Sequence, residues 1–356
     1  MPTEDTRDTR EILADIRSLT SILAVGVGPA TDLNPHAPNG PSDSDSFYLV
    51  SYLQDDKGHN FTLLFHLIVL NKPVPPAPLS LLAMSVLDET APAPYYFSKE
   101  ITDFGQKKTG VSKAGLDIRM FNDGRVSPFG SLFGTIDNLR IEGHAADAAG
   151  KPALDISLTL NALGPSFSYM GTGIIPFPGG LNYEYALPRM GTSGTLAVNG
   201  SSCNVTGTSW LDREWGHFGP AKWTWMSIEL HNGIQIGLWD QQPYDSSSSH
   251  VGGPAFATIL HPNGSLTLTT VTIKEDPTSL RPSADGKRTY ANRWSVSIPG
   301  RAELIVDTLV PGQEINGGSL IPRLEARCSV QGSYEGSLVT GLHTFVEVGT
   351  IAPPPP

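Results

Sequence analysis

Hydrophobic and polar residues alternate with a period of two along most of the chain, as expected of strands that bury one face. Residues 154–160 show this well, because Leu154, Ile156, Leu158 and Leu160 share one side of an extended segment and polar residues occupy the other. The segments with this pattern are short and separated by turn residues: 47–53, 61–70, 194–198, 223–230, 234–239, 265–273, 294–298 and 302–310. Many short strands of this kind predict an all-β protein, built as an antiparallel sandwich or barrel.

A helical period occurs near the beginning of the chain. Within residues 9–23, Ile12, Ile16, Leu19 and Leu23 recur at intervals of three and four positions, with charged residues between them. This spacing predicts a short amphipathic N-terminal helix. No other segment carries a convincing helical pattern, so we expect helices to contribute little to the fold.

The length of 356 residues predicts two structural lobes, since domains average about 150 residues. A Gly-Thr-Ser-Gly turn directly after Met190 is the place where we expect the first lobe to end. The expected organisation is an N-terminal helix and linker over 1–45, a first β lobe over 46–190, a second over 191–350 and a disordered Pro-rich tail over 351–356.

The net charge excludes one class of partner. The chain has 24 Lys and Arg against 35 Asp and Glu, a net charge of −11, and its longest basic run is Lys107-Lys108. Nucleic-acid binding needs clustered positive charge, so we expect no nucleic-acid partner. No apolar run approaches the roughly 18 residues of a membrane span, and no basic start precedes an apolar segment. We expect a cytoplasmic protein without a membrane span, or a secreted one if a signal peptide has been removed.

Residues that bind metals are too dispersed to predict a metal centre. The two cysteines, Cys203 and Cys328, either form one disulfide bond or remain as two buried thiols, and the sequence leaves both open. Several histidines are not spaced as ligand pairs: His217, His231, His250 and His261. The Gly-rich stretches lie between predicted strands rather than at the start of helices. We therefore expect neither a metal ion nor another cofactor.

Tryptophan is concentrated in one part of the chain. All six Trp lie between Trp210 and Trp294, and five of them precede residue 240: Trp210, Trp215, Trp223, Trp225 and Trp239. Such a cluster marks either the densest core or an aromatic-lined pocket. On the predicted strand 223–230, Trp223 and Trp225 share one face, and Met226 and Ile228 share the other.

Charged residues interrupt the tryptophan cluster at Asp212-Arg213-Glu214. In an extended segment, Asp212 and Glu214 face one way and Arg213 faces the other. Arg213 either forms an ion pair with a carboxylate across the lobes, which would fix the fold, or takes part in the chemistry, and both interpretations remain open. Burial among indole rings raises the pKa of a carboxyl group, which allows it to act as a general acid or base near neutral pH. His217 is a second candidate for proton transfer, or a hydrogen-bonded structural residue.

Three neighbouring motifs resemble those of one protein family: Tyr183-Glu-Tyr185-Ala-Leu-Pro-Arg189, Ser193-Gly-Thr-Leu196 and Ser209-Trp-Leu-Asp212-Arg-Glu-Trp215-Gly216. Their order and spacing resemble the lipocalin-like carotenoid hydratase (hydroxyneurosporene synthase) superfamily, which includes kievitone-hydratase-like and fungal Diels–Alderase-like proteins. The resemblance implies two lipocalin-like β-barrel or sandwich lobes with a hydrophobic ligand between or inside them. The chain departs from the family pattern at Ser46-Phe47-Tyr48 and at Leu324-Glu325-Ala326, which alters the pocket lining.

The residues and the resemblance together predict a natural-product tailoring enzyme that needs no cofactor and acts on a hydrophobic polyene, polyketide or terpenoid. Cyclisation of the Diels–Alderase type is the first expectation, because the altered first strand indicates a pocket unlike that of the carotenoid enzymes. The alternatives are hydration of a C=C by carboxyl acid–base catalysis and a lipocalin-type carrier without catalytic activity. We expect a monomer or a homodimer.

The expected catalytic residues are Asp212, as the first choice of acid, Glu214 and Arg213. The expected substrate-binding residues are mainly aromatic, and most surround this segment: Trp215, Trp223, Trp225, Trp239, Tyr183, Tyr185, His217 and Glu325. None of these residues is expected to bind a metal ion.

Overall fold

The structure, a computed structural model, describes residues 27–35, 42–71, 80–90, 93–103, 108–112, 115–121, 128–178, 180–244, 255–315, 319 and 321–352. The helix predicted over 9–23 lies outside these residues, as does most of the predicted tail. In the described part, helix is confined to α2 (Pro29–Asp32) and two 3-10 turns, η1 (Tyr169–Gly171) and η2 (Pro277–Ser279). The prediction of an all-β protein is therefore confirmed.

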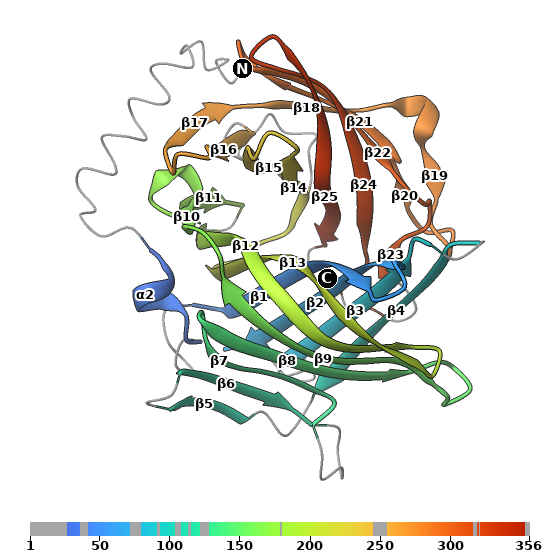
Figure 1. Ribbon diagram of the computed structural model, residues 1–356. Helices are drawn as coiled ribbons and strands as arrows, with labels where there is room; N and C mark the ends of the chain where they lie inside the picture. Colours follow the sequence, from blue (N-terminus) through green and yellow to red (C-terminus); the bar gives the residue numbers. More distant parts are fainter. Residues whose placement is uncertain are drawn as a thin grey trace.

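The first sheet contains thirteen described antiparallel strands and curves into a barrel-like shape (Figure 1). Their order is β4-β3-β2-β1-β13-β12-β9-β8-β7-β6-β5, and β10 and β11 pair with β12. The strands are β1 (Ser44–Asp55), β2 (Asn60–Leu70), β3 (Ser80–Asp88), β4 (Tyr95–Asp103), β5 (Lys108–Ser112), β6 (Gly115–Met120), β7 (Gly130–Thr135), β8 (Asn138–Ala146), β9 (Pro152–Ala162), β10 (Phe167–Ser168), β11 (Ile174–Phe177), β12 (Gly180–Val198) and β13 (Ser201–Gly216).

The second sheet contains ten described strands in the order β17-β16-β15-β14-β25-β24-β22-β21-β18, and β23 pairs with β24. A separate two-stranded ribbon joins β19 to β20. The strands are β14 (Ala221–Leu230), β15 (Gln235–Pro243), β16 (Phe256–Leu260), β17 (Leu266–Thr270), β18 (Thr272–Glu275), β19 (Arg281–Pro282), β20 (Thr289–Tyr290), β21 (Arg293–Ile298), β22 (Ala302–Thr308), β23 (Glu314–Ile315), β24 (Arg323–Tyr334) and β25 (Ser337–Ile351). In Figure 1 this sheet lies above the first.

The lobe boundary expected after Met190 falls inside β12, where a β-bulge between Leu187 and Met190 shifts the register with β13. The chain passes from the first sheet to the second between Gly216 and Ala221. The division into domains remains a prediction.

Alternation along the strands sorts the buried side chains into three cores. One lies within the first sheet and includes Leu211 and Trp215, and one lies within the second and includes Met226 and Ile228. The third takes residues from both sheets, Trp225 among them, and so lies between the lobes. Strand β14 contributes Met226 and Ile228 to one core and Trp225 to another, as its sequence pattern predicts.

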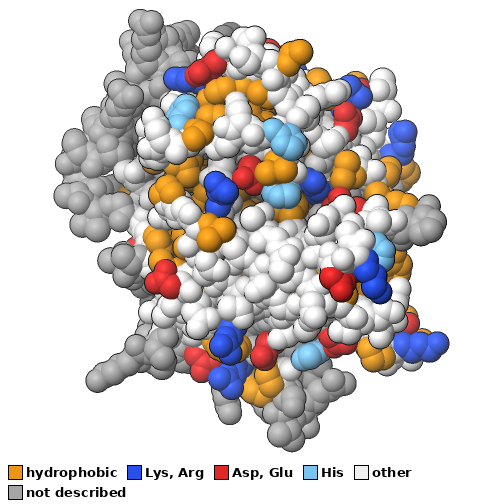
Figure 2. All heavy atoms as spheres, viewed as in Figure 1, with side chains coloured by type: hydrophobic (Ala, Val, Ile, Leu, Met, Phe, Trp, Pro, Cys, Tyr) orange, Lys and Arg blue, Asp and Glu red, His pale blue; other side chains and the backbone are white. Residues whose placement is uncertain are grey.

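Two further features bear on the sequence expectations. Cys203 and Cys328 are free thiols, and Cys328 is buried, so of the two alternatives the structure has unpaired thiols. Charged side chains of both signs are scattered over the face shown in Figure 2, without a basic patch. Among the described residues, no helix is long and apolar enough to span a bilayer.

Candidate active site

A cavity of about 160 Å³ lies between the two sheets, beside the third core. Strands β1, β2, β12 and β13 line one side of it, and β14, β15, β24 and β25 line the other. Half of its polar lining consists of carboxyl groups, those of Glu184, Asp212, Glu214 and Glu347, and the other polar residues are His66, Arg323, Ser44 and Ser46. Its apolar lining is rich in aromatic rings: Tyr48, Phe177, Phe218, Trp223, Trp225, Trp239, Ile68, Leu70, Ile321 and Ile351.

Strand register explains why residues far apart in the sequence meet here. One row across the first sheet contains His66, Tyr48 and Asp212. The next row contains Ile68, Ser46, Glu214 and Glu184. A row across the second sheet contains Glu325, Glu347, Trp225 and Trp239. The cavity lies where these rows approach each other.

Three carboxyl groups form one wall, and we call Glu184, Asp212 and Glu214 the carboxyl triad. Glu184 on β12 is directly opposite Glu214 on β13, and Asp212 is two residues before Glu214 on the same face. Glu184 and Asp212 are only 1% and 2% exposed. Asn182 donates its Nδ2 to Glu214 Oε1 at 3.1 Å.

Both oxygens of Asp212 accept hydrogen bonds. Trp210 Nε1 donates to Oδ1 at 2.8 Å, and the Tyr169 hydroxyl donates to Oδ2 at 3.0 Å. The direction of the second bond follows from a third, because Trp225 Nε1 donates to the Tyr169 oxygen at 3.0 Å and leaves its one hydrogen for Asp212. Gly237 permits this arrangement, since a Cβ there would lie 2.7 Å from the Tyr169 hydroxyl.

Burial raises the pKa of all three acids in the triad. The pKa of Asp212 rises to about 8, although the hydrogen bonds from Trp210 and Tyr169 oppose the shift. Burial and then the Asp212 charge raise the pKa of Glu214 to about 8 as well. Burial and then the neighbouring Asp212 and Glu214 charges raise the pKa of Glu184 well above its usual range. The triad therefore retains protons near neutral pH.

Arg323 organises the opposite wall. Its Nε lies 2.6 Å from Glu325 Oε1 and 3.3 Å from Glu347 Oε1, and Tyr48 donates its hydroxyl to Glu325. A guanidinium has only donors, so His66 Nδ1, 3.0 Å from Arg323, accepts from it. The proton of His66 is therefore on Nε2, which donates to Ser46 Oγ at 2.9 Å. Burial and then Arg323 hold the pKa of His66 well below its usual range, so the imidazole is neutral.

His66, Glu325 and Glu347 also have the spacing of a metal site. One ligand atom of each lies within 4.8 Å of the other two, and this is the one such group among the residues the structure describes. Arg323 contacts all three, so its guanidinium supplies positive charge at this point. This donor set fits a guanidinium better than a metal ion. The expectation of a metal-free protein stays a prediction.

The aromatic side of the cavity holds two buried indole N–H groups, those of Trp223 and Trp239. Neither Nε1 forms a well-aligned hydrogen bond within the described part of the chain, yet Trp239 lowers the pKa of Glu184 and Trp223 lowers the pKa of Glu347. Trp225 packs edge-on against Tyr48, with ring centroids 5.0 Å apart. Gly349 makes room for Trp223, because a Cβ there would lie 2.1 Å from the indole. The cavity therefore offers indole faces and two indole N–H groups to a ligand.

Some of the residues predicted from the sequence lie at the cavity, and others lie away from it. Asp212, Glu214, Trp223, Trp225 and Trp239 line the cavity, and Glu325 lies behind its wall, bonded to Arg323. Others lie away from it: Tyr183, Tyr185 and Trp215 belong to the core of the first sheet, and His217 Nδ1 lies 2.7 Å from Asp43 Oδ2 at the half-exposed rim.

Arg213 faces the core of the first sheet rather than the cavity. It forms a fully buried ion pair with Asp45. Its guanidinium lies 4.5 Å from the ring centroid of Phe47 and 4.7 Å from that of Trp215. The geometry is that of a structural ion pair, but one between neighbouring strands of the first sheet and not across the lobes as expected.

Sequence reasoning missed several residues of the site: Glu184, Tyr169, His66, Arg323 and Glu347. A signal for Glu184 was present, because the period of two that separates Asp212 from Arg213 also separates Glu184 from its neighbours Tyr183 and Tyr185. No local signal marks the others, which reach the site through pairing between distant strands.

The fold and the cavity together define a class of protein, an antiparallel β protein of lipocalin-like type with two sheets and a cavity between them. The model of the AttH-like family matches residues 43–343, and the chain belongs to this family. The resemblance seen in the sequence motifs is thereby confirmed.

Two curated relatives are similar over part of their length. "Dehydratase asqC" of Emericella nidulans is 23% identical over 172 residues, which are 47% of this chain and 50% of that protein. "Kievitone hydratase" of Fusarium solani subsp. phaseoli is 24% identical over 189 residues, 50% of this chain and 49% of that protein. The chain thus matches about half the length of the curated relatives.

Solved structures share the fold over nearly the whole chain. Kievitone hydratase from Nectria haematococca superposes with a TM-score of 0.70 at 20% identity, covering 92% of this chain and 94% of that one. CghA superposes with a TM-score of 0.51 at 11% identity, covering 92% and 98%. At these identities the likeness shows the fold alone.

Proposed function

We propose that this protein is a hydro-lyase that adds water to, or removes it from, a C=C bond of a hydrophobic natural product. The observation that carries the proposal is the carboxyl triad, three buried acids with raised pKa that face indole rings in one cavity. Two relatives named as a hydratase and a dehydratase support this reaction class. The reaction is reversible in principle, so one site serves both directions.

Hydration needs one protonated acid and one ionised carboxylate. The acid protonates the alkene, and the electron-rich faces of the indole rings stabilise the developing cation. The carboxylate then takes a proton from the attacking water. Neighbouring acids whose pKa values differ supply both forms at one pH. The aliphatic and aromatic remainder of the lining matches a hydrophobic substrate.

Pericyclic cyclisation, the first expectation from the sequence, is the second candidate. The observation in its favour is the pair of buried indole N–H groups on Trp223 and Trp239, neither of which forms a well-aligned hydrogen bond among the described residues. Such donors would polarise a dienophile carbonyl held in the cavity. A cyclase would leave the oxygen content of its substrate unchanged.

Incubation with prenylated and polyene substrates in ¹⁸O-labelled water separates the candidates. A hydratase incorporates the label and a cyclase gives an unlabelled isomer. Binding without any product would favour the carrier.

Asp212→Asn is expected to lower kcat at least 100-fold if the triad performs acid–base catalysis. Glu229→Gln, a buried acid outside the cavity, is the control and should retain activity. A wild-type rate in folded Asp212→Asn would refute the assignment.

A further inference from the structure

The geometry points to a fixed division of roles within the carboxyl triad: Glu184 donates the proton to the substrate, and Asp212, oriented by Tyr169, is the carboxylate that accepts a proton from water. This inference rests on the proposed hydro-lyase activity. It also reassigns the acid, since the sequence made Asp212 the first choice. Glu184 becomes a catalytic residue, and Tyr169 becomes a positioning residue.

Compared with those of Glu184, the surroundings of Asp212 favour the ionised form. Each of its oxygens already accepts a hydrogen bond, from Trp210 Nε1 and from the Tyr169 hydroxyl. Trp225 Nε1 donates to the Tyr169 oxygen, and the single hydroxyl hydrogen of Tyr169 is donated to Asp212. Hydrogen-bond donors that face both oxygens stabilise a carboxylate. A protonated carboxyl group is less favoured there, because its O–H would point towards a donor and not towards an acceptor.

The surroundings of Glu184 favour its protonated form. Its Oε2 is buried without a hydrogen bond in the described part of the chain, and burial and the neighbouring acids outweigh the Trp239 indole N–H, which lowers the pKa of Glu184. The titratable groups that face it are Asp212 and Glu214 on β13, Glu347 on β25 and the hydroxyl of Tyr169 in η1, and none of them is a cation. No described cation balances it, because Arg213 lies on the opposite face of the sheet and Arg323 is engaged on the other wall. An unpaired charge at this position would be costly, so Glu184 is the last member of the triad to ionise.

The local fold holds Tyr169 rigidly in place. It lies in the η1 turn, where Met170 has a φ of 52°, and Thr258 Oγ1 of the second sheet accepts a hydrogen bond from Met170 N at 3.1 Å. The turn therefore brings a first-lobe hydroxyl against β15 of the second lobe, above Gly237. Strained backbone such as that of Met170 often occurs next to functional residues, where it holds a side chain in a required position.

The resulting step is balanced. The O–H bond of Glu184 breaks, its proton forms a C–H bond with one alkene carbon, and a cation develops on the other. The oxygen of water forms a C–O bond there and loses one proton to Asp212. Net, one water is added, Glu184 is left ionised and Asp212 protonated. Transfer of the proton from Asp212 back to the adjacent Glu184, on the neighbouring strand, restores the starting state.

The order of ionisation can be measured on the protein alone. Infrared titration between about pH 6 and pH 10 follows the C=O band of protonated carboxyl groups. Glu184→Gln should remove intensity that persists at the alkaline end, and Asp212→Asn should remove intensity that disappears earlier in the titration. Glu229→Gln is the control for a buried acid outside the cavity. The opposite assignment of the two components, or no change in either variant, overturns the inference. Since no substrate is involved, this result is independent of whether water addition is the true reaction.

Tyr169→Phe tests the positioning role in the active enzyme. Loss of one donor raises the pKa of Asp212, so the acidic limb of the pH–rate profile should move up by roughly one pH unit. The alkaline limb, set by Glu184, should stay in place. Tyr52→Phe removes another buried hydroxyl outside the cavity, one without a described partner, and should leave both limbs unchanged. A shift of the alkaline limb instead, or a uniform loss of rate with no shift, contradicts the assignment.

Discussion

At the scale of single residues, the site consists of acids whose burial is unfavourable for folding. Burial raises the pKa of Asp212 to about 8, so the folded protein holds this proton more tightly than the unfolded chain does. The proton held by Asp212 stabilises the folded state. This stabilisation is complete below about pH 4 and is lost as the pH rises through about 8. The wild-type protein should therefore become less stable towards alkaline pH.

Asp212→Asn removes this titration while keeping the size of the side chain. We expect the Tm of the variant, relative to wild type, to rise with pH. The Asp212 side chain of the wild type must either stay protonated or become a buried charge as the pH rises, whereas the asparagine does not titrate. Thermal unfolding at pH 5 and at pH 9 measures the difference. A Tm difference that is constant across this range would show that Asp212 titrates as in an unfolded chain.

Arg213 provides the contrasting case of a buried charge with a partner. Arg213→Met leaves Asp45 buried without its guanidinium, so we expect a loss of about 3–5 kcal/mol in the free energy of unfolding. Urea unfolding gives this value. Because Arg213 lies on the far face of β13, variant protein that remains folded should keep its kcat. Unchanged stability with lost activity would instead support the catalytic role expected from the sequence.

At the scale of elements, period-two patterning predicted much of the site and pairing between strands supplied the rest. The alternation of β13 correctly separates Asp212 and Glu214 from Arg213, and that of β14 separates Trp225 from Met226. Applied to β12, the same rule would have favoured Glu184 over Tyr183. Arg323 could not be found in this way, since its role depends on contacts with His66, 257 positions away in the chain.

The close approach of Trp223 to β25 offers a test at this scale. In Gly349→Ala, the new Cβ would lie 2.1 Å from the indole of Trp223, so this ring, which lines the cavity, must shift. We expect a several-fold rise in KM with a smaller change in kcat, because the substrate loses space while the carboxyl triad is untouched. Gly164→Ala, where a Cβ meets no atom within 4 Å, is the control. An unchanged KM would mean that Trp223 does not contact the substrate.

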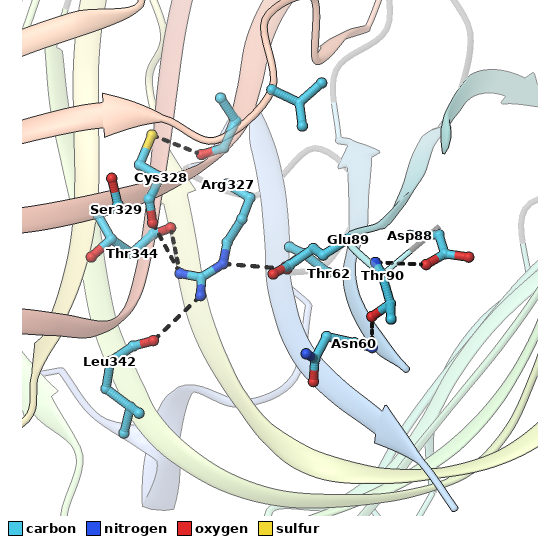
Figure 3. A network of polar contacts seen from close by, with 12 residues as sticks. Asn60, Thr62, Asp88, Glu89, Thr90, Arg327, Cys328, Ser329, Leu342 and Thr344 are labelled. Atoms are coloured by element: carbon cyan, nitrogen blue, oxygen red, sulfur yellow. Dashed lines mark hydrogen bonds and ion pairs between the residues drawn. The ribbon is translucent and has the colours of Figure 1, made fainter. Parts of the chain in front are cut away.

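At the scale of the whole molecule, the cavity exists because the two sheets are held face to face. The third core supplies apolar contact, and two arginines of β24 reach across to the first sheet. Arg323 lies at the cavity. Arg327 lies further along the interface between the two sheets, which we call the seam, and its Nε is 3.4 Å from Glu89 Oε1 (Figure 3). Thr62 on β2 donates to the same oxygen at 2.6 Å, and Arg327 lies over the ring of Tyr52 at 5.0 Å.

The Arg327–Glu89 contact should therefore contribute to the docking of the lobes. The side chains of Arg327 and Glu89 are only 14% and 21% exposed. We therefore expect a coupling energy of about 1 kcal/mol between them. A double-mutant cycle of Arg327→Leu and Glu89→Gln, measured by urea unfolding, gives this energy. Arg327→Leu alone should cost more than Glu89→Gln, because Arg327 also donates to the backbone oxygens of Cys328, Thr344 and Leu342. Additive effects of the two substitutions would show that the apolar contacts of the third core, and not this ion pair, hold the two sheets together. Because the cavity lies in the same seam, a measured coupling should be accompanied by a rise in KM in Arg327→Leu.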